Sequence, residues 1–322
     1  MLCLSAKSES LCFPIPALII AEAVTTHQKM SIIINIILLI IIGIIVYYTQ
    51  FRNKNSSDYF KSSQLKTKSK KLIEKNLDSA EIEQEFTNAL KILEKFKREA
   101  YIPQTKKNEN TFSTKSKIGG FPYLRNENDW PKCPNCKKNM QLFLQLNLKD
   151  LPKKIGEDII QLFYCTNNDS LCESELEAYL PFSKAVKCRN IKIQGESAST
   201  EPVIDEIFDE KLIVDWTIEN DYPHFEEYEK LGIKLNLFDE VYELMEERKI
   251  GLPLEKDKLF GWPYWIQAEE YPYDRKTGER MDLIFQLDSE DNLPYMFGDS
   301  GIGHLTKSPS DKNELAFNWA CC

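Results

Sequence analysis

The stretch that decides the fold is 118–148, IGGFPYLRNENDWPKCPNCKKNMQLFLQLNL, because the chain repeats it at 259–289 as LFGWPYWIQAEEYPYDRKTGERMDLIFQLDS. The two windows align without a gap at a constant offset of 141 residues and share eight identities. Self-similarity at a fixed offset indicates duplicated structural units. The sequence therefore predicts two related halves, at about 117–200 and 251–322, packed as a pseudo-symmetric pair.

Short apolar runs cut by Gly, Pro, Asn and Asp surround the repeat, which is typical of antiparallel sheet. The runs expected to form strands are Met140–Leu146, Ile159–Tyr164, Leu283–Leu287 and Tyr295–Phe297. Two helices are also predicted. One begins at Asp78, whose spacing to Glu81 is that of a capping box, and the other covers 237–249 with Asn236 as its cap. The predicted fold class is α+β, with antiparallel sheets in two pseudo-repeated halves and packed helices.

Four cysteines have the residue type and the number expected of a metal site. Cys133 and Cys136 are separated by two residues inside the first copy of the repeat, and Cys165 and Cys172 follow downstream. Two intervening residues let both sulfur atoms reach one metal ion from a tight turn, and four thiolates complete a closed tetrahedral zinc site. We therefore expect a structural zinc ion bound by these four residues.

Two other interpretations of these cysteines stay open. The first pair has the spacing of a redox couple, although that function favours a βαβ setting that the pattern does not predict. The four thiols can also be unrelated. In the second copy of the repeat Asp274 and Thr277 stand where the first copy has Cys133 and Cys136, so the metal is expected in one half only.

An uncharged apolar segment of 22 residues covers 30–51. As a helix it would be about 33 Å long, enough to cross a bilayer core of ~30 Å, and no signal-peptide cleavage site follows it. Residues 52–75 carry eight basic and two acidic side chains, which favours a cytoplasmic C-terminal part. The sequence thus predicts a single-pass inner-membrane protein with an anchor at 30–51 and a basic linker at 52–77. Residues 1–29 form a leader that is untranslated if synthesis begins at Met30.

The charge is unevenly distributed. The chain carries a formal net charge of −9, which argues against a nucleic-acid-binding protein, because phosphate contacts need a basic surface. Residues 52–75 contribute +6, so the remainder carries −15, and the stretch 201–249 alone carries −11. The expected domain after the linker is acidic.

No convergent set of catalytic residues stands out. Gly298-Asp-Ser-Gly301 matches the string around a serine-protease nucleophile, but that chemistry needs a histidine base and an oxyanion hole. Only His224 and His304 follow the apolar segment, and neither has a suitable context. The remaining enzymatic hypothesis is a membrane-tethered hydrolase that uses carboxylates near Asp299 and His304.

Six short motifs together resemble the YwqG-like family of bacterial proteins, over 78–322. They are Lys117–Tyr123, the Cys-Pro-Asn-Cys turn with Met140–Gln145, Asp221–Pro223, Gly261–Gln267, Phe285–Ser289 and Phe297–Gly303. The resemblance implies a domain of unknown function with an α+β fold built on antiparallel sheets. Members with a zinc knuckle carry glycine after the second cysteine, where this chain has Lys137. No catalytic residues are carried over.

These observations favour a binding protein over an enzyme. The predicted function is a membrane-anchored cytoplasmic interaction module with a structural zinc site, suited to neutralising a toxin or docking a protein partner. The membrane and a protein are the expected partners, nucleic acid is not, and a small-molecule ligand is left open.

Overall fold

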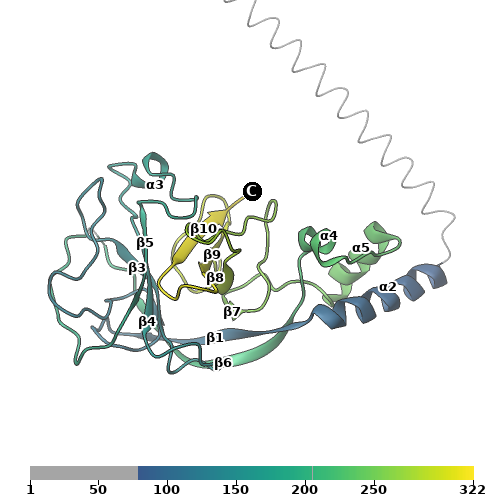
Figure 1. Ribbon diagram of the computed structural model, residues 1–322, viewed down its shortest axis with the longest axis horizontal. Helices are drawn as coiled ribbons and strands as arrows, with labels where there is room; N and C mark the ends of the chain where they lie inside the picture. Colours follow the sequence, from purple (N-terminus) through teal and green to yellow (C-terminus); the bar gives the residue numbers. More distant parts are fainter. Residues whose placement is uncertain (1–78, 205) are drawn as a thin grey trace, which may run out of the picture. The chain divides into compact units, whose positions relative to one another are not determined.

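The computed structural model describes residues 79–204 and 206–322, in which ten strands form one antiparallel sheet (Figure 1). The strand order is β10-β9-β8-β7-β1-β6-β2-β3-β4-β5. The strands are β1 (Arg98–Asn108), β2 (Lys117–Ile118), β3 (Gln141–Asn147), β4 (Ile159–Tyr164), β5 (Val186–Ile191), β6 (Glu210–Asp221), β7 (Lys258–Phe260), β8 (Asp282–Asp288), β9 (Ile302–Lys307) and β10 (Leu315–Ala320). The edge strands β5 and β10 also contact one another, so the sheet curves around a shared core.

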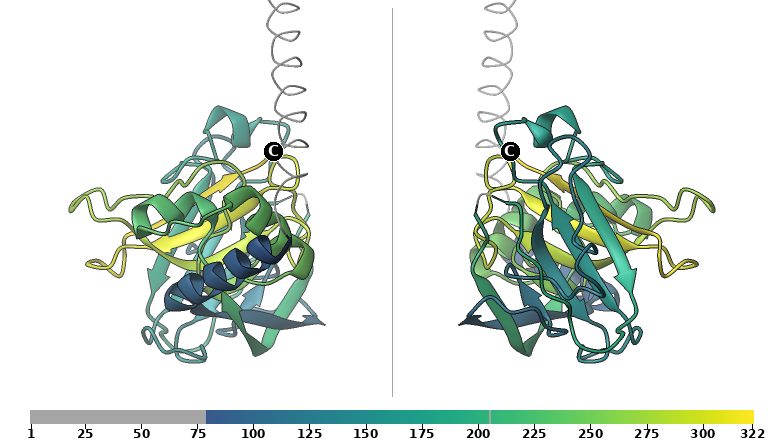
Figure 2. Two further views of the ribbon diagram at one scale, coloured as in Figure 1. Left: turned by 90° about the vertical axis from the view of Figure 1, so that its right-hand side faces the viewer. Right: turned by 90° about the vertical axis from the view of Figure 1, so that its left-hand side faces the viewer.

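Helices are a minor part of the described residues. They are α2 (Ser79–Leu93), η1 (Glu94–Phe96), α3 (Cys172–Glu175), η2 (Phe225–Glu227), α4 (Tyr228–Leu231) and α5 (Phe238–Arg248). The helices α2 and α5 pack on each other where the long strands β1 and β6 end, as the left panel of Figure 2 shows. The prediction of an α+β fold is therefore wrong: the structure is mostly antiparallel sheet with few helices.

Two details of the predicted helices differ from the structure. Asn236 does not cap α5, because Leu237 adopts a left-handed conformation with φ of 48° and Asn236 instead donates a side-chain hydrogen bond to Glu85 on α2. Asp78, the predicted cap of the first helix, lies outside the described residues.

The prediction of a single-pass inner-membrane protein also needs correction. Among residues 79–204 and 206–322, no helix is both long enough and apolar enough to cross a membrane. The segments on which that prediction rested, the leader at 1–29, the anchor at 30–51 and the linker at 52–77, lie outside the described residues.

The two sides of the sheet repeat one another in their hydrogen bonds. The side chain of Gln145 accepts a bond from the backbone of Tyr123 at 2.7 Å. The side chain of Gln286 accepts the corresponding bond from Tyr264 at 2.8 Å. Each glutamine amide donates to two backbone carbonyls, which belong to Ser113 and Lys115 in the first half and to Leu254 and Lys256 in the second. Each residue of the second network lies 141 residues after the corresponding residue of the first, which is the offset of the sequence repeat.

Two fully buried ion pairs stand at the two ends of β6. Lys117 on β2 bonds Glu210 at 2.8 Å, and Lys258 on β7 bonds Asp221 at 2.9 Å. Burial lowers the pKa of both lysines, while each paired carboxylate favours the charged ammonium. Lys117 and Lys258 are again 141 residues apart, so the repeat reproduces these pairs as well.

The glycine of the repeated Gly-aromatic-Pro-Tyr motif makes room for these carboxylates. Gly120 and Gly261 have φ of 74° and 79°, a backbone conformation that favours glycine. A Cβ atom at Gly261 would lie 2.2 Å from Asp221 Oδ2, and one at Gly120 would lie 2.6 Å from the Cβ of Glu210. The motif therefore requires glycine at its first position for two reasons: the positive φ of the turn and the close approach of a buried acidic side chain.

Aromatic side chains join the two halves in one core. Phe143 on β3 stacks on Tyr164 with ring centroids 4.8 Å apart. The same ring meets Tyr295 and Phe297 of the second half at 4.9 and 5.9 Å. The two halves therefore share a continuous hydrophobic cluster.

Candidate metal centre

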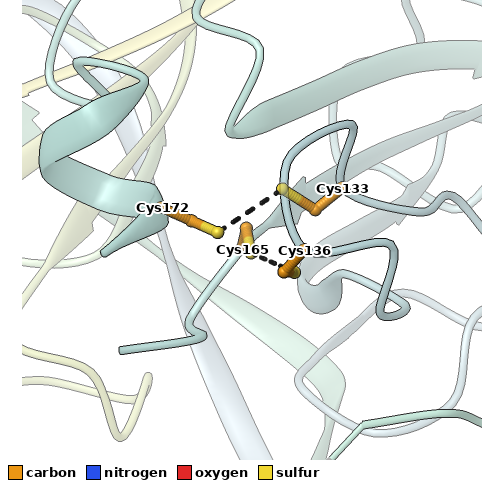
Figure 3. Close-up of side chains that lie close together, drawn as sticks. All are labelled: Cys133, Cys136, Cys165 and Cys172. Carbon is orange, nitrogen blue, oxygen red and sulfur yellow. Dashed lines mark hydrogen bonds between the residues drawn. The ribbon is translucent and has the colours of Figure 1, made fainter. Parts of the chain in front are cut away.

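Four cysteine sulfur atoms converge at one point of the first half (Figure 3). The Sγ atoms of Cys133, Cys136, Cys165 and Cys172 lie within 4.8 Å of one another. Cys133 and Cys172 are 3.7 Å apart, as are Cys136 and Cys165. Zinc–sulfur bonds of ~2.3 Å in a tetrahedron place the sulfurs about 3.8 Å apart, whereas a disulfide needs about 2.05 Å. The spacing fits a shared metal ion and excludes disulfides between these residues.

Three separate segments supply the ligands. Residues 131–140 form a loop, here called the knuckle loop, in which the backbone of Cys133 donates to Lys138 O at 2.9 Å and accepts from Lys137 N at 2.9 Å. Cys165 follows directly after β4, and Cys172 begins α3. A metal ion at this point would hold together the knuckle loop, the end of β4 and the start of α3.

Lys137 occupies the position where glycine is the expected residue. Its φ is 65°, and Gly278, at the corresponding position of the second half, has φ of 71°. The knuckle loop therefore keeps its left-handed turn without glycine, at a cost of about 1 kcal/mol. The cysteine geometry is formed although Lys137 stands in place of glycine.

The environment of the sulfurs suits a cation. Burial opposes ionisation of Cys136, but hydrogen bonds from the Asn167 side chain and the Lys138 backbone outweigh it and lower its pKa to about 7. Burial raises the pKa of Cys165 and of Cys172. A bound divalent ion would offset the unfavourable burial of these thiolates, because it stabilises the ionised sulfurs directly. The Asn135 amide also donates to Cys172 Sγ at 3.4 Å, as expected of a group that supports a metal ligand.

Hydrogen bonds replace the cysteines in the second half. Asp274, the counterpart of Cys133, accepts bonds from the backbone of Lys276 and Thr277 at 2.7 and 2.9 Å. Ser308, which follows β9 as Cys165 follows β4, lies beside this carboxylate. Together these neighbours lower the pKa of Asp274 to about 2, and the Ser308 hydroxyl makes the largest contribution. The same turn is thus closed by an aspartate network in one half and by four cysteines in the other.

Cavities flank the cysteine cluster. One has a volume of about 880 Å³ and is lined by the knuckle loop, by residues 182–189 and by residues 200–203. Its lining residues include Trp130, Phe182, Lys132, Lys184 and Lys187. The loop that carries two of the cysteines therefore also forms a wall of a ligand-sized cavity.

The residues of the hydrolase hypothesis are not assembled. His304 on β9 is 2% exposed and lies against Trp265 with ring centroids 4.7 Å apart. Burial lowers its pKa to about 3, so the imidazole is neutral at physiological pH. Asp299 is exposed, and the structure shows no hydrogen bond or ion pair between these two described residues. The geometry gives no support to their joint use in catalysis.

His304 is expected to make folding sensitive to acid. An unfolded histidine binds a proton near pH 6.5 and the folded one only near pH 3, so the unfolded state binds more protons between these values. The stabilising contribution is therefore complete above pH 6.5 and declines as the pH falls. In the first half Gln161 on β4 lies opposite Gln145 on β3. In the second half His304 on β9 lies opposite Gln286 on β8. Glutamine therefore fits the position of His304, and His304→Gln is a suitable substitution.

Between pH 7 and pH 4.5 the wild type should lose about 2 kcal/mol more unfolding free energy than His304→Gln. Urea denaturation at both pH values measures this difference. Loss of metal at low pH affects both proteins alike and cancels in the comparison. Equal losses in the two proteins would show that His304 is not held neutral.

The comparisons with known proteins give one finding. A family model described as "Domain of unknown function (DUF1963)" matches residues 116–322. The matched segment contains the four clustered cysteines and the strands from β2 to β10. A search of curated proteins gave no match. The prediction of a domain of unknown function is confirmed, and the narrower YwqG-like name stays a resemblance.

Proposed function

We propose that this chain, which belongs to the DUF1963 family of domains of unknown function, is a protein-binding module stabilised by a structural zinc ion. The observation that carries the proposal is the cluster of four cysteine sulfurs within 4.8 Å of one another. Four thiolates at this spacing satisfy tetrahedral zinc and leave no position for a reacting water molecule. The ion would therefore act on structure and not on chemistry.

The position of the cluster connects the metal to binding. Zinc bound there would fix the knuckle loop against β4 and α3. The same loop lines the cavity of about 880 Å³, through Lys132 and Pro134. Cavities of roughly 300–1,000 Å³ accommodate small ligands or anchoring side chains of a partner. The metal would thus set the shape of a binding surface in the first half.

Metal content tests the proposal. Protein purified under reducing conditions without chelator should contain one zinc ion per chain by elemental analysis. Cys133→Ser and Cys172→Ser should lose most of it, because each removes one of the four ligands. Cys322→Ser is the matched control, since Cys322 is exposed and outside the cluster, and it should keep the full content.

Two results would refute the metal site: wild-type protein without zinc, or Cys133→Ser with a full equivalent. The binding role is tested separately, by comparing wild type with Cys133→Ser in the capture of protein partners. A partner retained equally by both proteins would show that the metal does not shape the binding surface.

A further inference from the structure

A second cavity, of about 440 Å³, lies in the half of the molecule that has no cysteine cluster. Three cationic side chains line it, and each stands over an aromatic ring. Arg98 lies 3.4 Å from the ring centroid of Trp262, Arg280 lies 4.2 Å from that of Tyr271, and Lys153 lies 6.0 Å from that of Phe260. Stacking of this kind holds a cation in a defined place.

The first half shows what occupies the corresponding place. There the chain itself supplies Val203 and Glu206, which lie beside the knuckle loop and the start of β3. The backbone of Asn139 donates to Val203 O at 2.9 Å, and Val203 N donates back to Asn139 Oδ1 at 2.8 Å. Gln141 donates its side-chain amide to Glu206 O. Backbone groups of Val203 and Glu206 are therefore bound to the edge at 139–141.

The second half has the same edge without such a segment. Arg280 and Asp282 stand 141 residues after Asn139 and Gln141. The chain that leads into β1 turns away into η1 and α2, and Trp262 Nε1 donates to Phe96 O at 2.8 Å. Among the hydrogen bonds of the described residues, the backbone N–H of Arg280 has no partner. The edge at 280–282 is thus open where its counterpart is covered.

The charges of this cavity favour an acidic occupant. Arg98 and Lys153 form no ion pair with any described residue, whereas Arg280 pairs with the buried carboxylate of Glu227 at 4.0 Å. The cavity also contains two carboxylates. Glu99 accepts a hydrogen bond from Tyr101 at 2.9 Å, and Asp282 remains at the edge, where a carboxylate can accept a backbone N–H. Arg98 and Lys153 are therefore the two lining cations that have no carboxylate partner among the described residues.

We propose that this cavity binds an extended acidic segment of a partner protein, which bonds the edge at 280–282 as Val203 and Glu206 bond the edge at 139–141. Backbone hydrogen bonds to an open edge supply affinity, and the side chains between them supply specificity. Here the specificity comes from carboxylates directed at Arg98, Lys153 and Arg280. The inference rests on the proposed protein-binding function but not on the metal.

The probe for this site is a fluorescently labelled peptide with the sequence of residues 201–207, Glu-Pro-Val-Ile-Asp-Glu-Ile. It carries three carboxylates and the segment that occupies the corresponding edge. Fluorescence anisotropy with the whole chain should show saturable binding that weakens as salt rises. Arg280→Gln and Lys153→Gln should each weaken it at least tenfold.

Matched controls separate the cavity from general charge attraction. Lys115→Gln removes the same charge from an exposed side chain outside the cavity and should leave the affinity unchanged. A peptide in which every Glu and Asp is replaced by Gln and Asn should bind at least tenfold more weakly. Thermal denaturation of each variant establishes that it is folded.

Absence of saturable binding at peptide concentrations up to 1 mM would overturn the proposal, and so would equal weakening by Lys115→Gln and Arg280→Gln. Either result with a full equivalent of zinc in the protein refutes this site and leaves the metal centre intact. Peptide binding by a protein without zinc would instead refute the metal centre alone.

Discussion

Removal of the metal is expected to cost the domain at least about 4 kcal/mol of unfolding free energy, because the ion would cross-link three separate segments of the chain. Structural zinc sites contribute more than this in small zinc domains, whose cores are slight. Here a continuous hydrophobic cluster spans both halves of the described domain. We therefore expect a destabilised domain that still folds at low temperature.

The loss of stability should appear first near the cysteine cluster and only then in the rest of the domain. Hydrogen exchange after chelation should accelerate first in the knuckle loop, at the end of β4 and in α3. The corresponding turn at 272–281 is an internal control, since Asp274 closes it with hydrogen bonds alone. Thermal denaturation with and without chelator measures the stability, and Cys322→Ser should respond as the wild type does. Equal exchange rates in both turns after chelation would contradict a metal that stabilises the first half.

Breaking either buried ion pair is the second large effect. Lys258→Met leaves the carboxylate of Asp221 buried without its cation, which should cost about 3–5 kcal/mol. Lys117→Met should do the same to Glu210 in the other half. Methionine preserves the apolar stem of lysine, so the measured loss reports the charge more than a cavity.

Lys256→Met provides the matched control for this experiment. Its ammonium pairs with Glu219 at 3.2 Å, but both side chains are more than a third exposed, so the expected loss is below about 1 kcal/mol. Urea denaturation of the three variants gives the comparison. If Lys258→Met cost no more than Lys256→Met, the buried pair would not be holding β6 to β7.

The cysteine cluster was accessible to sequence reasoning because its signal is local. Two thiols two residues apart in a turn need little tertiary information to be assigned to one metal ion. Cys165 could be added because it ends a recognisable apolar strand. The metal identity stays a proposal, since the geometry shows four close sulfurs and not the ion.

The strand β1 escaped sequence reasoning for the opposite reason. Residues 98–108 contain Pro103 and many polar side chains, a composition that does not indicate a strand. Their conformation is set by pairing with β6, more than a hundred residues later, from Arg98 opposite Asp221 to Asn108 opposite Glu210. Strand formation of this kind depends on the partner and not on intrinsic propensity.

Sequence reasoning did not predict the burial of Lys117 and Lys258, although the two lysines occupy equivalent positions of the repeat. Lys117 and Lys258 precede the Gly-aromatic-Pro-Tyr motifs by the same spacing in both copies. Lysine is rarely buried without a partner, so composition assigns such residues to the surface. Their acidic partners Glu210 and Asp221 lie outside the repeated windows, and only the three-dimensional pairing of β6 with β2 and β1 brings them close.

The placement of β1 means that the unit of folding is larger than the unit of family similarity. The family match begins at residue 116, after this strand, yet β1 is hydrogen-bonded to β6 on one side and to β7 on the other. A fragment cut at the start of the match would leave the backbone groups of both neighbours unpaired, and such edges invite association with other chains. Neither half can therefore be excised as a self-sufficient piece, and any dissection of the protein has to keep the residues from α2 through β1.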